Sequence, residues 1–338
     1  MNKKLKKLIF ILFVIALSVF LFVSLNLLFM PKYINENHDG RITAEYYREK
    51  PYVDVLFVGS STVNSDINPI FLWENFGITS YDRANASQTS WISYYMIKDA
   101  IDCSAPKMVV LDLEFFYQDD NYVEEVSNRK SFDGMRFSRD KFRAIEAAKG
   151  EDETYWDYLF PIFRFHTRWK DLGKDDIKYM YYKPYVTFNG YIASDRIEPA
   201  AETGTGEFPG AVTLSPRNRM FLEETIKLCK ENGLELLLIK TPTSTPKWGP
   251  EFDAQIRQIA EENGIAYIDL DEHTDETGID YSTDTQDGGS HLNDFGAAKL
   301  SAYMGNCLRF VYGVADHRGD PAYDAVWSKK CERYHNGR

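Results

Sequence analysis

A run of 23 residues without a charge, Leu8 to Met30, constrains this chain more than any other feature. As a helix this run is about 34 Å long, enough to cross a hydrocarbon core of about 30 Å. Four lysines precede it, between Lys3 and Lys7. Lysines before a span hold that end of the chain in the cytoplasm. We therefore expect residues 1–31 to be a transmembrane signal anchor in the cell membrane. Everything after Pro31 would then be extracytoplasmic.

A cleaved signal peptide is the alternative interpretation of this run. The apolar region of a signal peptide is about 7–15 residues long and ends in small residues at a cleavage site. Here the run is longer and ends in SLNLLFMPKY, without such a triplet of small residues. The pattern favours an uncleaved, single-pass anchor.

The chain as a whole has the composition of a globular protein. Of 338 residues, 44% are apolar and 27% are charged, and this length is sufficient to bury a core. The net charge is 39 − 51 = −12, which argues against nucleic acid as a partner, because such binding depends on neutralising phosphates. No CxxC pair and no histidine pair with metal-ligand spacing occurs. We expect neither a metal nor a cofactor.

Strand-like and helix-like segments alternate along the chain. Apolar runs over 53–58, 108–113, 234–239 and 266–270 predict buried strands, and the periodicity over 68–75, 90–101, 215–232, 250–263 and 296–310 predicts helices. Strands that are apolar throughout and alternate with helices indicate a parallel sheet covered on both faces. The predicted fold class is therefore α/β.

This alternation also predicts how the chain is divided. We expect a polar stalk over 32–50, one α/β domain over 51–312 and a polar C-terminal tail over 313–338. The stretch from about 119 to 210 does not alternate and is rich in Tyr, Phe, Trp and Arg, so it is expected to be an insertion. Such an insertion is either a structural cap or a lid and substrate platform.

Two motifs predict nucleophilic chemistry at one edge of the sheet. The first strand ends in Gly59-Ser60-Ser61, and ligands of open parallel sheets bind beyond the carboxyl ends of strands. A serine there is a nucleophile only with a base beside it. His291 follows Asp287 in the motif DGGSH, near the other end of the chain. A histidine accepts the serine proton and an aspartate fixes its tautomer, so these residues predict a Ser61–His291–Asp287 triad.

The same two motifs carry a family resemblance. DVLFVGSSTV resembles the nucleophile block, and DGGSHLNDFGAAKLS the Asp–His block, of the SGNH/GDSL hydrolase superfamily. FPIFRFHTRW and LLLIKTPT are similar to a bacterial membrane-anchored subgroup, which is distantly similar to proteins that assist D-alanylation of teichoic acids. The resemblance covers roughly residues 50–312. It implies a three-layer α/β/α fold with the insertion added to it.

The resemblance also implies a function. The expected activity is that of a serine esterase or O-acyltransferase acting on O-acyl groups, acetyl above all, of a cell-surface polysaccharide or a small ester. A membrane-bound O-acyltransferase is an implied partner. The alternative is a non-catalytic glycan-binding or accessory subunit of a polysaccharide acylation and export complex. A separation of the serine hydroxyl from the histidine ring beyond hydrogen-bond reach would favour that alternative.

The Asp–His motif departs from the superfamily pattern. The usual aspartate lies three residues before the histidine, and that position is Gly288 here. Asp287 lies four residues before His291, so the loop must bulge to place it, and the two glycines can supply the bend. Asp284 is the less favoured substitute.

The expected oxyanion hole departs further from the superfamily pattern. Gly59 and Ser60 form the nucleophile turn, and Asn85 stands in the loop that matches the second block. The third block of the superfamily supplies an Asn side chain, whereas this strand is followed by Glu114. Losing one oxyanion donor costs about 10²–10³ in rate. Either Asn85 and the Ser61 N–H suffice, or another residue replaces the missing donor, or the protein is a poor hydrolase.

The insertion holds a further candidate group. His166, Arg168 and Trp169 lie together in an aromatic and basic run. Arg168 and Trp169 could hold an anionic or sugar substrate. For His166, a packed histidine that is hydrogen-bonded within the insertion is favoured over a catalytic one.

Overall fold

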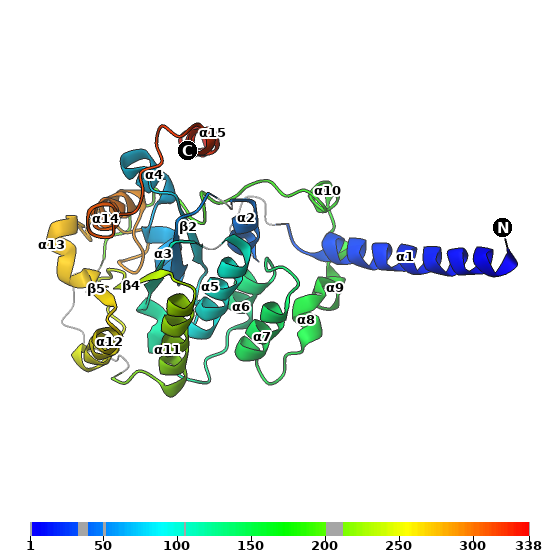
Figure 1. Ribbon diagram of the computed structural model, residues 1–338, viewed down its shortest axis with the longest axis horizontal. Helices are drawn as coiled ribbons and strands as arrows, with labels where there is room; N and C mark the ends of the chain where they lie inside the picture. The colour runs from blue at the N-terminus through cyan, green and yellow to red at the C-terminus, as the bar shows by residue number, and fades with distance from the viewer. Residues whose placement is uncertain (1, 33–39, 50–51, 105, 201–211, 338) are drawn as a thin grey trace.

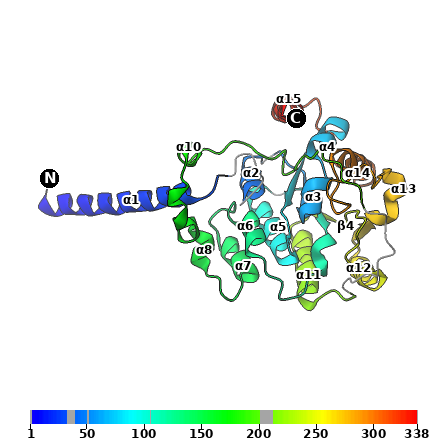
Figure 2. The same cartoon turned by 180° about the vertical axis from the view of Figure 1, so that it is seen from behind.

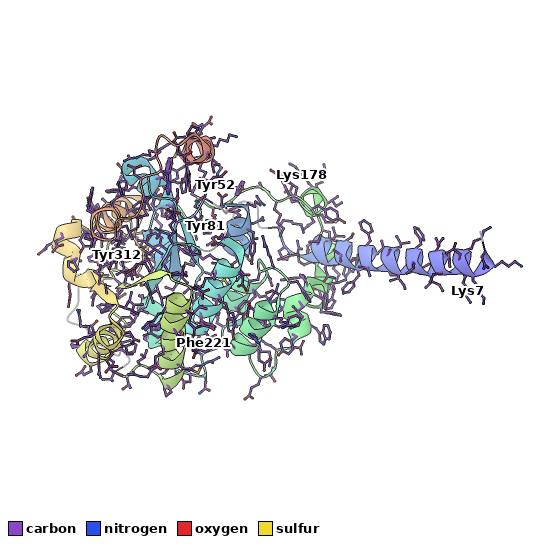
Figure 3. All side chains as sticks on the ribbon, viewed as in Figure 1. Lys7, Tyr52, Tyr81, Lys178, Phe221 and Tyr312 are labelled. Carbon is purple, nitrogen blue, oxygen red and sulfur yellow. The ribbon has the colours of Figure 1, made fainter. Side chains whose placement is uncertain are left out.

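The computed structural model describes residues 2–32, 40–49, 52–104, 106–200 and 212–337. Figure 1 shows a rounded body of strands and helices, from which a long helix, α1 (Lys3–Phe29), projects on one side. The apolar side chains of α1 are exposed along most of its length, with Lys7 near the far end (Figure 3). Among the described residues α1 is the one helix long and apolar enough to cross a membrane, a test that a signal sequence also passes.

A five-stranded sheet lies at the centre of the body. Its order is β2-β1-β3-β4-β5, and every neighbouring pair is parallel. The strands are β1 (Val55–Gly59), β2 (Ser80–Ala84), β3 (Met108–Asp112), β4 (Glu235–Lys240) and β5 (Ala266–Asp269). In the register, Val55 of β1 lies beside Ser80 of β2 and Met108 of β3. The carboxyl ends of all five strands therefore meet at one edge.

Helices cover both faces of this sheet. Leu56 and Val58 of β1 pack into one core with α5 (Ser90–Ser104), α11 (Pro216–Glu231) and α12 (Pro250–Asn263). Val55 and Phe57 pack into a second core with α3 (Ser61–Asp66), α4 (Pro69–Phe76) and α14 (Asp294–Asn306). Successive side chains of a strand point to opposite faces, so an all-apolar strand needs a cover on each. The predicted three-layer α/β/α fold is confirmed.

Helix starts follow the local chemistry of the sequence. Asn68 caps α4, because its Oδ1 accepts hydrogen bonds from the backbone N–H groups of Ile70 and Phe71 at 3.0 and 3.1 Å. Ser215 caps α11 in the same way, and each helix has proline at its first position. The short elements α13 (Thr274–Thr277), η1 (Glu114–Tyr117), η3 (Leu270–His273) and the π-helical turn η4 (Cys307–Val311) complete the body.

Strand β2 has no apolar pattern and was not predicted. Its residues, SYDRA, include two charged side chains, yet all five are buried. Arg83 is neutralised by Asp99, with the side chains 2.6 Å apart, and it also donates to the Met96 carbonyl. Tyr81 donates its hydroxyl to the Ile42 carbonyl at 2.8 Å. Partners elsewhere in the chain, and not its own composition, make this segment a buried strand.

Residues 41–49 correct the prediction of a stalk over 32–50. They form α2 (Arg41–Glu49), which packs against β2 with Ile42 and Tyr46 buried in the core. The Glu45 carboxylate accepts hydrogen bonds from the backbone N–H groups of Val186 and Thr187 at 2.7 and 3.1 Å. The segment is polar, but these distant partners satisfy its charges inside the fold. Residues 33–39 and 50 lie outside the described residues.

The predicted insertion is a group of short helices. They are α6 (Glu125–Phe132), α7 (Arg139–Ala148), α8 (Tyr155–Leu159), α9 (Pro161–Phe165), η2 (His166–Lys170) and α10 (Lys174–Lys178). The described residues of the insertion add no strand to the sheet. Figures 1 and 2 show α8, α9 and α10 gathered around the end of α1 that meets the body. Residues 201–210 of the insertion lie outside the described residues.

The predicted tail, residues 313–338, contains a packed helix. This is α15 (Pro321–Asn336), whose Trp327 is fully buried and stacks on Trp73 of α4 with ring centroids 5.1 Å apart. Tyr334 accepts a hydrogen bond from the Asn68 side chain at 2.9 Å. The segment is polar on average, but its aromatic side chains anchor it to the body, so it is not peripheral.

Candidate functional site

Ser61 stands on a tight turn at the carboxyl edge of the sheet. Strand β1 ends at Gly59, Ser60 precedes the helix as its N-cap, and Ser61 is the first residue of α3. A Cβ at Gly59 would lie 2.6 Å from Val63 Cγ2 and 2.7 Å from Asp112 Cβ, closer than carbon atoms approach. Glycine is therefore required here. The Ser61 N–H lies in the first turn of α3, where N–H groups have no carbonyl partner in their own helix.

The loop before α14 bends as the extra residue in the Asp–His motif requires. Gly288 and Gly289 have φ angles of +81° and +105°, in the region that favours glycine. The Gly289 carbonyl accepts hydrogen bonds from the Ser244 N–H at 2.9 Å and the Thr243 hydroxyl at 3.1 Å. A Cβ at Gly289 would lie 1.7 Å from Ser244 Oγ. The loop after β4 thus holds the Asp–His loop in place.

The side chains of Ser61, His291 and Asp287 form one hydrogen-bonded chain. His291 Nε2 lies 2.8 Å from Ser61 Oγ, and His291 Nδ1 lies 2.5 Å from Asp287 Oδ2. Asp287 Oδ1 also accepts from the His291 backbone N–H at 2.9 Å. With the Nδ1 proton directed at the carboxylate, Nε2 presents its lone pair to the serine hydroxyl. The structure therefore brings together the three residues that the sequence predicted.

Asp284, the less favoured substitute, has other partners. Its buried carboxylate pairs with Lys299, 2.6 Å away, and accepts from the Asp280 N–H at 2.8 Å. These bonds direct it away from His291.

Ser61 and His291 open onto a cleft of about 240 Å³. Asn85 lines this cleft, as do the cationic side chains Lys130 and Arg196, which sequence reasoning missed. Asn85 is buried, and its amide donates to Gln88 Oε1 at 3.4 Å. The loop after β2 therefore brings an amide side chain to the nucleophile's side of the cleft.

Glu114 lies beneath the nucleophile turn and is not among the residues that line the cleft. Its Oε2 is 3.5 Å from Ser60 Oγ, and Ser60 is linked through Thr62 to Asp112, each step 3.0 Å long. Burial, with Asp112 as the next cause, raises the pKa of Glu114 to about 7. Burial likewise raises the pKa of Asp112 to about 6. Below pH 7 Glu114 is therefore mostly uncharged.

Asp66 is a positioning residue that sequence reasoning missed. It ends α3, is fully buried, and accepts a hydrogen bond from the Leu292 N–H at 2.8 Å. The helix that carries Ser61 is thus bonded to the residue after His291. Burial raises the pKa of Asp66 well above its usual range. The only signal in the sequence was an acid within the motif SSTVNSDINP.

His166, Arg168 and Trp169 are not brought to the cleft. All three lie in η2, at the end of α1. Arg168 donates to the Phe29 carbonyl at 2.5 Å and to Asp176 at 2.9 Å, so its guanidinium holds the insertion to α1. His166 Nδ1 is 2.9 Å from the Phe163 carbonyl, and Trp169 is exposed.

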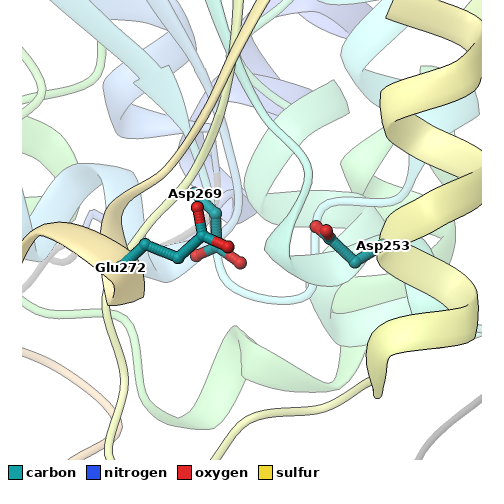
Figure 4. A group of neighbouring side chains, drawn as sticks. All are labelled: Asp253, Asp269 and Glu272. Atoms are coloured by element: carbon teal, nitrogen blue, oxygen red, sulfur yellow. The ribbon is translucent and has the colours of Figure 1, made fainter.

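A group of carboxylates between α12 and the carboxyl end of β5 is already compensated by cations. Figure 4 shows Asp253, Asp269 and Glu272, with one oxygen of each within 4.8 Å of the others. Arg257 donates to Asp253 and Glu272 at 2.5 and 2.8 Å, and Lys240 donates to Asp269 at 3.0 Å. The group is a charge network between α12 and β5.

Comparisons with known proteins give structural neighbours only. No family model and no curated protein matches the chain. A candidate acylhydrolase from Bacteroides fragilis NCTC 9343 is 14% identical with a TM-score of 0.39, over 83% of this chain and 99% of its own. A GDSL-like lipase from Bacteroides thetaiotaomicron VPI-5482 is 10% identical with a TM-score of 0.35, over 76% of this chain and 88% of its own. Likenesses this weak do not show what the chain does.

Proposed function

We propose that this protein is a serine esterase or O-acyltransferase with Ser61 as its nucleophile. The observation that carries the proposal is the chain from Ser61 through His291 to Asp287, with both distances within hydrogen-bond range. A serine hydroxyl becomes a useful nucleophile when a base stands beside it and a third group orients that base. This arrangement opens onto a cleft that can admit an ester.

The geometry supports acyl transfer in two steps. Ser61 Oγ attacks the ester carbonyl carbon while its proton passes to His291 Nε2, and Asp287 stabilises the imidazolium. When the intermediate collapses, the carbon–oxygen bond to the leaving alcohol breaks and His291 returns the proton to that alcohol. Water or a sugar hydroxyl then gives its proton to His291 and attacks the acyl carbon. When the bond from that carbon to Ser61 Oγ breaks, His291 returns the proton to Ser61.

Two donors are available for the oxyanion. The Ser61 N–H lies in the first turn of α3, and the Asn85 amide lines the same cleft. Asn85 would replace the third-block Asn, whose position is taken by Glu114. Since Glu114 lies beneath Ser60 and is mostly neutral below pH 7, it does not place a full charge against the developing oxyanion there.

The substrate proposed is an O-acyl group, acetyl above all, on a cell-surface polysaccharide. A cleft of about 240 Å³ is smaller than the roughly 300–1,000 Å³ of typical ligand sites, which favours a short acyl group. With α1 as an anchor and its lysines in the cytoplasm, the domain would face the extracytoplasmic glycan. A membrane-bound O-acyltransferase is the partner that we propose for the transfer reaction.

The alternative, a non-catalytic accessory subunit, has one feature in its favour, which is the missing third-block Asn. A separation of the serine hydroxyl from the histidine ring beyond hydrogen-bond reach would also have favoured the accessory role. The distance of 2.8 Å supports the enzyme instead.

A fluorophosphonate probe, which reacts with activated serines, tests the proposal on the full-length protein in detergent. We expect labelling of the wild type and none of Ser61→Ala or His291→Ala, because an unassisted hydroxyl is a weak nucleophile. Ser65→Ala is the matched control, since this serine lines the same cleft but its hydroxyl is directed at Asn64. A folded wild type that never labels would favour the accessory role.

The orienting acid is tested by two isosteric changes. Asp287→Asn should lower esterase activity about 10⁴-fold, the effect of losing this group in known triads. Asp284→Asn removes a carboxylate that pairs with Lys299, so the triad should keep its activity. The reverse pattern would reassign the role to Asp284.

A further inference from the structure

We propose that residues 154–185, here named the interfacial platform, dock on the outer surface of the bilayer that α1 crosses. The platform contains α8, α9, η2 and α10, and its occupant is phospholipid. This inference concerns a surface distinct from the catalytic cleft. It rests on the proposal that α1 is retained as an anchor.

The platform is bonded to the last turns of α1. The Ile162 N–H donates to Asn26 Oδ1 at 3.1 Å, and Arg168 donates to the Phe29 carbonyl at 2.5 Å. The hydroxyl groups of Ser24 and Tyr181 lie 2.6 Å apart. Three bonds spread over this end of α1 fix the orientation of the platform relative to the anchor. Wherever α1 enters the bilayer, the platform must lie beside it.

The depth of these contacts places the platform at the boundary of the hydrocarbon. A core of about 30 Å takes about 20 helical residues, so a span that starts at Leu8 ends near Leu27. Phe22 lies about 7 Å inside that end. Its ring packs on Phe160 with centroids 5.1 Å apart, and Phe160 stacks on Trp156 at 5.6 Å. Interfacial helices bury their apolar face about 5–10 Å into this boundary.

The exposed side chains of the platform suit this position. Large apolar or aromatic side chains that are exposed there are Trp156, Phe163, Trp169, Ile177, Tyr181, Tyr182 and Tyr185. Tryptophan and tyrosine concentrate where a bilayer meets water. Figures 1 and 2 show the helices of the platform on the side of the body from which α1 projects, so these side chains need not face bulk water.

Charge and shape favour lipid as the occupant. Residues 154–185 contain six basic and four acidic side chains, a net charge of +2 in a chain of −12. Three of the lysines and two of the aspartates are exposed, whereas Arg164 pairs with Glu125 outside the platform. A basic surface attracts anionic headgroups. Trp156, Phe160 and Phe163 line, together with Phe22 of α1, an open groove of about 480 Å³. Such a groove beside the anchor can receive a lipid acyl chain.

Tryptophan emission gives a test on the full-length protein. Of the six tryptophans, Trp156 and Trp169 are exposed on the platform, and Trp73, Trp91, Trp248 and Trp327 are buried in the body. We would reconstitute the protein into phosphatidylcholine–phosphatidylglycerol vesicles with or without brominated acyl chains, which quench tryptophans they touch. Brominated lipid should lower wild-type emission by up to about one third, the share of two tryptophans in six.

The double variant Trp156→Phe/Trp169→Phe should lose this decrease. Trp248→Phe, which removes a buried tryptophan, should keep it. Flotation of the vesicles on a density gradient reports the anchor separately. Protein that floats without quenching overturns the docking surface alone, and protein that fails to float overturns both the anchor and the platform. Fluorophosphonate labelling of the double variant should equal that of the wild type, because the platform lies apart from the cleft.

Discussion

At the scale of single residues, the buried carboxyl groups beneath the nucleophile turn set the response to pH. Glu114 and Asp112 have no lysine or arginine within hydrogen-bond range among the described residues, and hydroxyl and backbone groups are their main partners. Their pKa values are raised because burial disfavours the charged form. The sequence resemblance marked Glu114 as a departure from the superfamily pattern. It did not show that the side chain is buried under Ser60.

Glu114→Gln should change how stability depends on pH. The pKa of Glu114 is about 7 in the folded protein and near 4.5 when unfolded, so the folded state binds more protons between these values. Stability therefore falls as pH rises through this window. The variant should be more stable than the wild type at pH 8, by up to about 3 kcal/mol, with little or no advantage near pH 4.

Thermal unfolding at the two pH values checks this prediction. Glu223→Gln, on an exposed part of α11, is the control and should leave the pH dependence unchanged. If the difference between Glu114→Gln and the wild type is the same at pH 4 and pH 8, the raised pKa is wrong.

At the scale of elements, α3 and the loop before α14 act as one unit. Asp66 at the end of α3 accepts from the Leu292 N–H, so the helix that carries Ser61 is bonded to the residue next to His291. The two elements lie more than 200 residues apart in the chain. Catalytic geometry of this kind must be held by contacts between elements as well as within them.

Asp66→Leu should abolish fluorophosphonate labelling while Ser61 stays intact. The change leaves the buried Leu292 N–H without an acceptor, at a cost of about 1–3 kcal/mol, and releases the histidine loop. Asp66→Asn keeps an uncharged acceptor of the same size and should restore labelling to near the wild-type level. A simple structural defect would show instead as a matching loss of melting temperature in both variants. Equal labelling of Asp66→Leu and the wild type would remove Asp66 from its positioning role.

At the scale of the whole molecule, α1 and the body are connected by side-chain hydrogen bonds as well as by the chain itself. The side chain of Asn26 is mostly buried, and its oxygen accepts from the Ile162 N–H, while Arg168 bonds to the Phe29 carbonyl. Cleavage after the apolar run would remove both acceptors. This favours a helix that is retained over a signal peptide that is removed.

We therefore expect intact protein in membrane fractions. Mass analysis should find the N-terminal residues still attached, and extraction should require detergent. A soluble mature form that begins near Lys32 would contradict this prediction.

Local pattern determined much of this protein. Apolar runs specified four of the five strands. Of these, β1, β3 and β4 are buried almost throughout, and a strand buried on both faces must be apolar, whereas β5 lies at the edge of the sheet and is only partly buried. Capping residues such as Ser215 marked helix starts, because the cap bonds are local. The spacing of Asp287 from His291, with two glycines between them, was enough to predict their contact, because the whole bend lies within five residues.

Only the tertiary structure decided the rest. The polar segment SYDRA became β2 and the predicted stalk became α2 because Arg83 pairs with Asp99, and Glu45 accepts hydrogen bonds from Thr187. Arg168, which the sequence offered only as a candidate for holding substrate, binds the end of α1, and Asp66 acquired its role from Leu292. The amino-acid sequence does not show whether a charged side chain is exposed to solvent or buried beside a partner. Only the folded chain brings those partners within hydrogen-bond range.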